Sequence, residues 1–451
     1  AEISKAQSGH PGIALGAAPI LYTLYNKHMN IDVTDDKWIN RDRFVMSAGH
    51  GSALLYATLY MSGFNLSIND LKNFRQIDSI TPGHPEYGIT PGVDASTGPL
   101  GQGIANAVGM AAAEKYLSEK FNNLLDYKVY VLCGEGDLME GISYEACSLA
   151  GNLKLGNLIV LYDSNGVTLD ADANKTFDED VLKRFDAMGW HTDLVADGNN
   201  PILIDMAISK AKRRTDKPSF IEIKTIIGKD SILQGTNKVH GSPLTKEDIR
   251  QLKDKLKLDT NLFANISSLR KEMANFIRIR VTHDKRKWDT KYNAYINTCD
   301  DETKRFLESL TIDKRYDITR LFKDKTFSDD ALRNINGAVM NEIANNYPAF
   351  LGGSADLSSS TKTYLNKFGD FSSTNYGGKN FFFGVREHAM GAFINGLALS
   401  GLRPFCSTFL SFSDYLKPSI RMASLMNLPC TFVFTHDSVM VGEDGPTHEP
   451  V

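Results

Sequence analysis

The sequence has few cysteines, and their spacing excludes two kinds of site. Five cysteines occur in 451 residues, at positions 133, 147, 299, 406 and 430, and no two of them form a CxxC pair. This odd number, without a metal-binding spacing, argues against a disulfide framework and a zinc site. We therefore expect a reducing compartment, the cytoplasm. The sequence begins without Met, so a transit peptide ahead of Ala1 or a C-terminal domain after Val451 would not be visible in it.

A long apolar run and an excess of charge of one sign are also missing. No stretch of 18 apolar residues occurs, so we expect no membrane span. The 50 basic and 54 acidic residues leave a net charge of −4, which gives no general attraction to nucleic acid or to a membrane. The length suffices for two or three globular domains. We expect the partners to be small molecules or a second copy of the chain.

Two common nucleotide-binding motifs are absent as well. The glycine-rich stretch TGPLGQGI is not a Walker motif, because no GK[ST] follows it. In GEGDLMEG four residues separate Gly136 from Gly141, whereas the dinucleotide-binding fingerprint has two residues in that gap. The sequence therefore disfavours a nicotinamide-dependent dehydrogenase.

What the sequence does contain is a strand–helix–strand pattern over residues 127–170. Residues 127–133 and 157–163 are short apolar runs that end in glycine or polar residues, as buried strands do. Residues 138–149 have apolar side chains at helical spacing. This pattern predicts a right-handed βαβ unit with two parallel strands.

Oxygen-bearing groups follow both strands of this unit. Glu135 follows the first strand, and Asn165 follows the second, close to the backbone carbonyl of Val167. Ligands of parallel sheets collect beyond the carboxyl ends of the strands. Carboxylate, amide and carbonyl oxygens suit magnesium or calcium and leave positions for phosphate oxygens. We interpret the segment as a metal diphosphate site. An ordinary strand–helix–strand unit with surface acids is the alternative, and this segment alone does not decide between them.

Four histidines lie on loops that contain glycine or proline. They are His10 in SGHPG, His50 in SAGHG, His84 in TPGHPE and His240 in VHGSPL. A structural histidine is the alternative for each one, but the repetition favours a shared site. Gly98, Gly101 and Gly103 also lead into a helix, an arrangement that offers backbone N–H groups to phosphate.

Two α/β patterns are separated by a charged stretch. The first includes predicted helices at 13–26 and 201–213, with strands ending at Ser47 and in GWHTDLVADG and PSFIEIKTIIG. The second begins near residue 328, with helices at 329–345 and in HAMGAFINGLALSG and strands in AFLGG, FFFGVRE and CTFVFTHDS. We predict an α/β fold with two parallel-sheet domains, 1–270 and 326–451, joined by a solvated helical linker, 271–325. A cofactor held between domains is expected.

Nine strings of residues carry a family resemblance. They are SGHPG, INRDRFVMSAGH, TPGHPE, TGPLGQGI, EGISYEACSLAGNLKLGNLI, VHGSPL, GGSADL, VREHAMGA and THDSVMVGEDGPTH. In these strings and their order the chain resembles transketolase, a thiamine diphosphate enzyme, over nearly its whole length. The resemblance implies a diphosphate-binding domain followed by a partial pyrimidine-binding domain that is truncated at its C-terminus. It also implies a homodimer with active sites at the subunit interface.

The resemblance implies a set of metal and cofactor ligands. Glu135, Asn165 and the carbonyl of Val167 match the ligands of Mg²⁺ or Ca²⁺. The family usually has Asp where this chain has Glu135, so the longer arm puts the metal geometry in question, and the adjacent Asp137 falls outside the matching register. The residues implied to surround thiamine diphosphate are His50, Gly98, Leu100, Gly136, Asn165, His240, Glu387, Phe409, Phe412 and Tyr415.

Three glutamates are implied in proton transfer. Glu387 matches the glutamate that hydrogen-bonds the aminopyrimidine ring, for which its carboxyl must be protonated or share a proton near pH 7. Burial can achieve this by raising its pKa. Glu140 and Glu145 match carboxylates that extend a proton relay across the dimer interface, with surface acids on a helix as the alternative. For Phe409, Phe412 and Tyr415 the alternative is core packing, which is compatible with the cofactor role.

The resemblance also implies which residues contact the sugar. These are His10, His84, His240, Arg333, Ser360, His436, Asp444 and His448. His84, His240 and His448 join Glu387 as implied catalytic residues, because imidazoles can move protons during bond cleavage. Arg333, Ser360 and His436 match a phosphate site whose second arginine is expected beyond Val451, and Asp444 matches the residue that reads a hydroxyl configuration.

The implied activity is the transfer of a two-carbon ketol group from a ketose phosphate, such as xylulose 5-phosphate, to an aldose phosphate. The acceptors are ribose 5-phosphate or erythrose 4-phosphate, in the pentose phosphate pathway. Dihydroxyacetone synthase and deoxyxylulose-phosphate synthase are alternatives of related chemistry. An inactive relative that serves as a binding module is a third, motivated by Glu135 and by the expected missing C-terminal portion.

Overall fold

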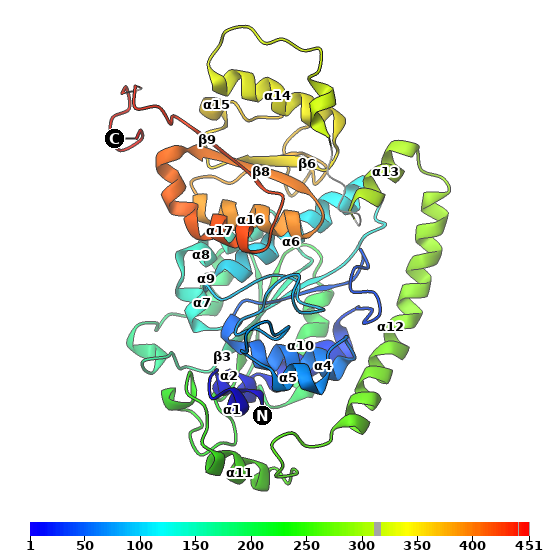
Figure 1. Cartoon of the computed structure of the whole chain (residues 1–451), viewed down its shortest axis with the longest axis vertical. Helices are drawn as coiled ribbons and strands as arrows, with labels where there is room; N and C mark the ends of the chain where they lie inside the picture. The colour runs from blue at the N-terminus through cyan, green and yellow to red at the C-terminus, as the bar shows by residue number, and fades with distance from the viewer. Residues whose placement is uncertain (311–316, 441, 451) are drawn as a thin grey trace. The chain divides into compact units, whose positions relative to one another are not determined.

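In the part of the chain that the structure describes, the strands form two sheets, and all strand pairs in them are parallel. The computed structural model describes residues 1–310, 317–440 and 442–450 (Figure 1). The chain divides into two compact units, each with one sheet: Ala1–Ile104, Tyr127–Ser143 and Gly156–Thr290 form the first, and Ala105–Asp126, Tyr144–Leu155 and Lys291–Val451 form the second. The predicted α/β class with two parallel sheets is confirmed, whereas the domain boundaries at 270 and 325 stay a prediction.

The first unit is built on a five-stranded sheet of order β1-β2-β3-β5-β4. Its strands are β1 (Arg43–Met46), β2 (Val129–Cys133), β3 (Leu158–Ser164), β4 (His191–Val195) and β5 (Ser219–Lys224). Strands β2 and β3 are parallel neighbours in the centre, with Val129 opposite Leu158. The predicted pairing of a βαβ unit is therefore confirmed, and its polar residues lie at the carboxyl edge of this sheet.

One helix predicted for the first unit is broken into shorter pieces. The single helix predicted at 13–26 is wrong, because the structure has α2 (Pro11–Gly16), α3 (Ala18–Thr23) and a π-helical turn η1 (Leu24–His28). Pro19 explains the break between α2 and α3, since a proline lacks the N–H donor and its ring clashes with the carbonyl four residues earlier. Further helices are α1 (Glu2–Ala6), η2 (Gly49–Gly51), α4 (Ser52–Ser62), α5 (Ile68–Lys72), η3 (Ala173–Lys175), α9 (Val181–Ala187), α10 (Pro201–Lys212), η4 (Asn237–Val239) and α11 (Lys246–Lys255).

The helix predicted at 138–149 is also two helices. The structure has α7 (Glu135–Met139) and α8 (Gly141–Asn152), and Glu140 between them has an extended backbone, with φ −69° and ψ 133°. Because α7 begins directly after β2, the side chain of Glu135 stands at the first turn of a helix. The break places Glu140 on the surface.

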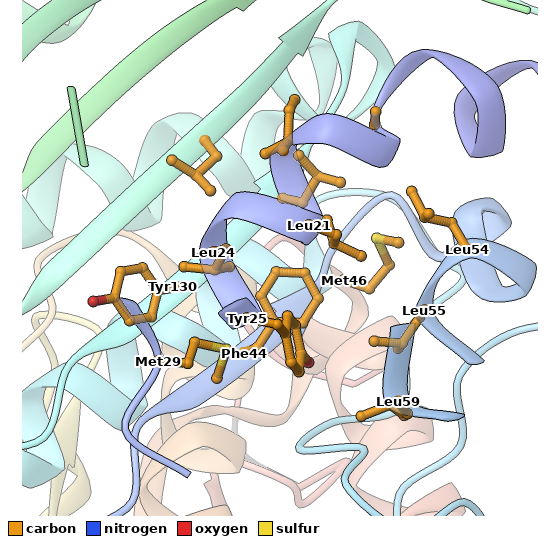
Figure 2. Close-up of a cluster of buried hydrophobic side chains, with 14 of the residues drawn as sticks. Leu21, Leu24, Tyr25, Met29, Phe44, Met46, Leu54, Leu55, Leu59 and Tyr130 are labelled. Atoms are coloured by element: carbon orange, nitrogen blue, oxygen red, sulfur yellow. The ribbon is translucent and has the colours of Figure 1, made fainter. Parts of the chain in front are cut away.

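A hydrophobic core covers one face of the first sheet. In Figure 2, Tyr25, Phe44 and Tyr130 lie among leucines and methionines that come from the N-terminal helices, β1 and α4. The labelled set is Leu21, Leu24, Tyr25, Met29, Phe44, Met46, Leu54, Leu55, Leu59 and Tyr130, all of them buried. Burial of a side chain of this size contributes about 1.5–3 kcal/mol, so this core anchors the sheet edge that carries the site.

The charged stretch is helical, as predicted, but part of it is integral to the first unit. Helix α12 (Ser267–Ile296) begins before the predicted linker. Arg270 donates to the carbonyls of Tyr60 (2.8 Å), Phe64 and Leu66 at the end of α4, and Arg280 donates to those of Tyr25, Asn26 and Met29 (2.7 Å) around η1. The two arginines thus supply side-chain donors to carbonyls at and just beyond the ends of two helices, where backbone donors are scarce. Residues 311–316 of the predicted linker lie outside the described residues.

The second unit contains a four-stranded sheet of order β7-β6-β8-β9. Its strands are β6 (Phe350–Ser354), β7 (Asn380–Phe382), β8 (Arg403–Phe409) and β9 (Thr431–Thr435), and its helices are α6 (Gln102–Lys120), most of α8, α13 (Asp301–Ser309), η5 (Ile318–Leu321), α14 (Leu332–Asn346), α15 (Ser358–Thr361), α16 (Glu387–Leu399), η6 (Leu410–Phe412) and α17 (Ser413–Leu425). The sequence analysis missed β8 and α17. Strand β8 is a central strand, but its polar Ser407 interrupts the apolar run expected of a buried strand. Ser407 forms hydrogen bonds with Thr361 and Thr363 inside the unit.

No helix among the described residues is long and apolar enough to cross a membrane.

Candidate active site

Glu135, Asn165 and Val167 lie together at the carboxyl ends of β2 and β3. The carboxylate of Glu135 is 4% exposed and accepts a hydrogen bond from the backbone N–H of Gly166 at 2.6 Å. The side-chain oxygen of Asn165 accepts from the N–H of Val167 at 3.0 Å. The predicted ligand residues therefore lie close together where β2 and β3 end, as the sequence pattern indicated.

The charges of this loop are suited to a divalent cation. Burial raises the pKa of Glu135 to about 7, and the negative charge of Asp163 adds to the increase. Burial also raises the pKa of Asp163 itself to about 6. Ionising two neighbouring buried carboxyl groups costs free energy, because each charge loses hydration and the two charges repel each other. A nearby cation offsets that cost. No group of three or more His, Cys, Asp or Glu side chains in the described part of the chain could hold a metal. Amide and backbone oxygens would therefore complete the ligand set, as magnesium accepts.

Asp137 holds the turn after β2 and the glycine-rich loop together, a role that the sequence analysis missed. Its fully buried carboxylate accepts from the hydroxyl of Ser47 (2.6 Å) and from the backbone N–H groups of Gly101 (2.9 Å) and Gly134 (3.1 Å). Burial raises the pKa of Asp137, while these three donors oppose the increase. Ser47 follows β1 and Gly134 follows β2, so one side chain fixes the ends of two strands and the turn into α6.

Replacing Asp137 by Leu is expected to destabilise the protein by about 3 kcal/mol or more, because three buried donors lose their acceptor at about 1–3 kcal/mol each. Asp137→Asn, which keeps one acceptor oxygen, should cost about half as much. Chemical denaturation without cofactor measures both. Asp186→Leu, which changes an exposed acid on α9, serves as the control. An Asp137→Leu protein as stable as the control would contradict the bridging role.

The four histidines predicted from separate loops form one cluster. The rings of His50 and His240 stack with centroids 5.1 Å apart, and His10 lies 5.2 Å from His50, 5.9 Å from His240 and 6.3 Å from His84. Each ring is half-buried. The loops that carry them come from distant parts of the sequence, and the first sheet brings them to one edge.

These imidazoles are neutral at physiological pH. Burial, with a smaller contribution from Arg75 and from the neighbouring histidines, lowers the pKa of His10 to about 4. Burial likewise lowers the pKa values of His50, His84 and His240. A neutral imidazole has one N–H donor and one acceptor nitrogen. The cluster can therefore bind several hydroxyl groups and exchange protons with them.

The glycine-rich loop adjoins this cluster through close backbone packing. A Cβ atom at Gly98 would lie 3.6 Å from the ring of His84, and the φ of +148° at Gly98 disfavours any other residue. A Cβ atom at Gly136 would lie 2.8 Å from the side chain of Leu100. The predicted cofactor residues Gly98, Leu100 and Gly136 are thus brought together around the loop, next to the first turn of α7.

In the second unit, Glu387 begins α16 with its side chain only 8% exposed. Burial raises its pKa, the charge of Glu145 adds to the increase, and the Thr408 hydroxyl, which donates from 3.5 Å, opposes it. Glu145 accepts from the N–H of Ala389 at 2.9 Å and so caps the first turn of α16. The relay role of Glu145 and of the exposed Glu140 stays a prediction.

Aromatic rings and a cation lie beside the end of β8. Phe409 stacks on His436 at 3.8 Å and on Phe412 at 5.9 Å, and Phe412 lies 5.1 Å from His448. Arg333, at the start of α14, lies 3.1 Å from the His436 ring nitrogen Nε2.

The remaining predicted residues of the second unit are less enclosed. Tyr415 lies 6.2 Å from Phe412 but is 63% exposed, and Asp444 is exposed. Ser360 is half-buried in α15. Within the described part of this unit, no side-chain hydrogen bond or ring contact joins Ser360 or Asp444 to Arg333, His436 or His448, so their roles stay predictions.

The sequence of the chain is similar to those of known proteins. Residues 1–314 match the family model described as the thiamine diphosphate binding domain of transketolase, and residues 330–451 match that of the transketolase pyrimidine binding domain. The transketolases of Bacillus subtilis and Aquifex aeolicus are 51% and 47% identical to the chain, covering all of it and 68% and 66% of their own lengths.

Solved transketolase structures are similar to the chain in fold. A Pichia stipitis transketolase in complex with sedoheptulose 7-phosphate has a TM-score of 0.96 at 39% identity, and the Campylobacter jejuni transketolase has 0.92 at 44%. Each comparison covers the whole chain and 68% or 69% of the solved one. With its two matching domains and its relatives along the full sequence, the chain belongs to the transketolase family of thiamine diphosphate-binding transferases.

Proposed function

We propose that the protein transfers a two-carbon ketol group reversibly from a ketose phosphate, such as xylulose 5-phosphate, to ribose 5-phosphate or erythrose 4-phosphate. This places it in the pentose phosphate pathway. The observation that carries the proposal is the cluster of four neutral histidines at the carboxyl edge of the first sheet. The same edge carries the buried carboxylate of Glu135. A sugar substrate presents several hydroxyl groups, and such a cluster can both bind them and move their protons.

The residues of the first unit fit the diphosphate end of thiamine diphosphate. Glu135, Asn165 and the Val167 carbonyl would hold Mg²⁺ or Ca²⁺, with His50, His240 and the backbone at Gly98 and Gly136 as partners of the diphosphate. A Cβ atom at Gly136 would clash with Leu100 at 2.8 Å, and the φ of Gly98 disfavours other residues, which supports a close approach of the backbone to a ligand here. When held by these residues, thiamine diphosphate would supply the carbanion chemistry that ketol transfer requires.

The residues of the second unit fit the aminopyrimidine end. The buried carboxyl of Glu387 can share a proton with a ring nitrogen, because burial and Glu145 raise its pKa. Phe409, Phe412 and Tyr415 offer flat apolar surfaces to the ring. Arg333 supplies a cation for the sugar phosphate, beside His436 and with Ser360 as a further donor. His84, His240 and His448 act on the hydroxyl protons.

A coupled assay of purified protein with thiamine diphosphate and Mg²⁺ tests the activity. We expect product from xylulose 5-phosphate with ribose 5-phosphate, and much less with formaldehyde as acceptor or with pyruvate plus glyceraldehyde 3-phosphate. A preference for formaldehyde would instead indicate dihydroxyacetone synthase, and one for pyruvate deoxyxylulose-phosphate synthase. If calorimetry showed no metal-dependent binding of thiamine diphosphate, the protein would be an inactive relative.

We further propose a homodimer in which the first unit of one subunit and the second unit of its partner complete each site. The support is the family resemblance and the division of the implied cofactor residues between two units. Mixing a Glu135→Gln subunit with a Glu387→Gln subunit should then restore activity, because one site of each mixed dimer contains neither change. Random mixing predicts recovery to about one quarter of the wild-type rate, whereas sites within one subunit predict none.

We propose the cytoplasm as the location, because an odd number of cysteines without CxxC spacing favours a reducing compartment.

A further inference from the structure

Arg75 connects two of the histidine loops. It follows α5, and its backbone has a φ of +62°, a left-handed conformation that is uncommon for residues other than glycine. Its Nη1 donates to the hydroxyl of Ser8 at 2.9 Å, in the loop of His10. Its Nη2 donates to the carbonyl of Gly83 at 3.3 Å, in the loop of His84. One guanidinium therefore fixes the relative position of two loops that approach the cluster from different parts of the chain.

The same guanidinium determines which nitrogen of His10 carries the proton. Arg75 Nη2 lies 3.5 Å from His10 Nδ1. A guanidinium has only N–H donors and keeps its proton at all physiological pH values. The Nδ1 atom must therefore be the acceptor, and the proton of the neutral ring lies on Nε2. His10 then presents an N–H donor from Nε2, which lies near Gly241, the residue after His240.

The charge of Arg75 also opposes protonation of the cluster. It acts on His10 and on His84 in the same direction as burial, and both effects lower the pKa of each ring. The groups that bear on His10 are Arg75 from the segment after α5, His50 from η2, His84 from its loop and His240 from the loop after η4. No carboxylate among the described residues contributes to the shift at His10.

We propose that Arg75 is a positioning residue for ketol transfer: it holds the His10 and His84 loops together and fixes His10 as a neutral N–H donor toward a substrate oxygen. The proposal rests on the proposed function for its catalytic meaning. Its physical part, the tautomer and the charge state of His10, can be measured without substrate or cofactor.

Three variants separate the contributions of charge, geometry and stability. Arg75→Met removes both the charge and the hydrogen bonds. Arg75→Lys keeps the charge but loses the planar fork that reaches Ser8 and Gly83 together. Arg270→Met serves as the control, because Arg270 also donates to backbone carbonyls of the first unit but lies on α12 and contacts the end of α4.

The first readout is ¹⁵N NMR of the imidazole rings in the full protein without cofactor, with His10 assigned by a His10→Gln variant. We expect the Nε2-H tautomer of His10 in wild type and in Arg270→Met. In Arg75→Met the tautomer should become mixed. The pKa of His10 should rise by about one unit, because removal of a nearby positive charge favours the protonated ring. Arg75→Lys should keep the lowered pKa while losing the single tautomer.

The second readout is ketol transfer by the loaded enzyme. We expect kcat/KM to fall about 10–100-fold in Arg75→Met and about tenfold in Arg75→Lys, with thiamine diphosphate affinity within twofold of wild type in both. A wild-type His10 with its proton on Nδ1, or an Arg75→Met protein with an unchanged His10 pKa, would overturn the proposal. Absence of ketol transfer in wild type would overturn the proposed function instead, and the NMR result would still decide the state of His10.

Discussion

Glu387→Gln is expected to lower kcat for ketol transfer about a thousandfold, within the range of about 10²–10⁴ that proton transfer by a positioned side chain contributes. Glutamine has the volume of glutamate and keeps an oxygen to accept from Thr408, but it cannot share a proton with the aminopyrimidine ring. Burial and the charge of Glu145 raise the pKa of this carboxyl, which favours its protonated form.

The fold should survive this substitution. The side chain is at the first position of α16, and the cap of that helix comes from Glu145, which the variant retains. Steady-state kinetics measures the loss, and thermal unfolding should give a midpoint within about 2 °C of wild type. Asp414→Asn, an exposed acid in the first turn of α17, is the control and should keep full activity. Ketol transfer by Glu387→Gln or Glu387→Ala at the wild-type rate would refute the assigned role.

Glu135→Gln is expected to weaken Mg²⁺-dependent binding of thiamine diphosphate about a hundredfold, which corresponds to about 2.7 kcal/mol. Glu135 is the one formal negative charge among the three proposed ligands, and a hard divalent cation binds a neutral amide less well. Loss of a mere hydrogen-bond partner of a ligand costs about 10–100-fold in other metal sites, so loss of the ligand charge should reach at least the upper end.

Calorimetry at a fixed Mg²⁺ concentration measures this effect. Glu135→Asp retains the charge and should bind within about tenfold of wild type, although its shorter arm gives up the hydrogen bond from Gly166. Asp178→Asn changes an exposed acid that lines the same pocket and is the matched control. If Glu135→Gln bound the cofactor as tightly as Asp178→Asn does, Glu135 would not be a metal ligand.

Local patterns predicted the strands that carry the site. Short apolar runs that stop at glycine or polar residues identified β2 and β3, because a buried parallel strand needs apolar side chains on both faces. The same reasoning failed for β8, whose Ser407 is polar but bonded within the unit. It also failed at Pro19 and Glu140, where continuous apolar spacing masked a break in the helix.

Some site residues could likewise be found from the sequence, and others only from the structure. Local residue patterns singled out Glu135 and the histidine loops, whereas the proposed role of Glu387 came from the family resemblance alone. Asp137 and Arg75 could not be, since Asp137 bonds to Ser47, which lies 90 positions away, and Arg75 bonds to Ser8 at 67 positions. Such hydrogen bonds have no sequence periodicity.

The sequence by itself determined the family, two parallel sheets and the residues whose chemistry suits a metal, a diphosphate and sugar hydroxyl groups. Only the tertiary structure decided that four histidines share one cluster, that they are neutral, and which buried groups hold their loops in place. The physical reason is that residue type is a local property, whereas burial, charge state and hydrogen-bond partners depend on which distant segments the fold brings into contact.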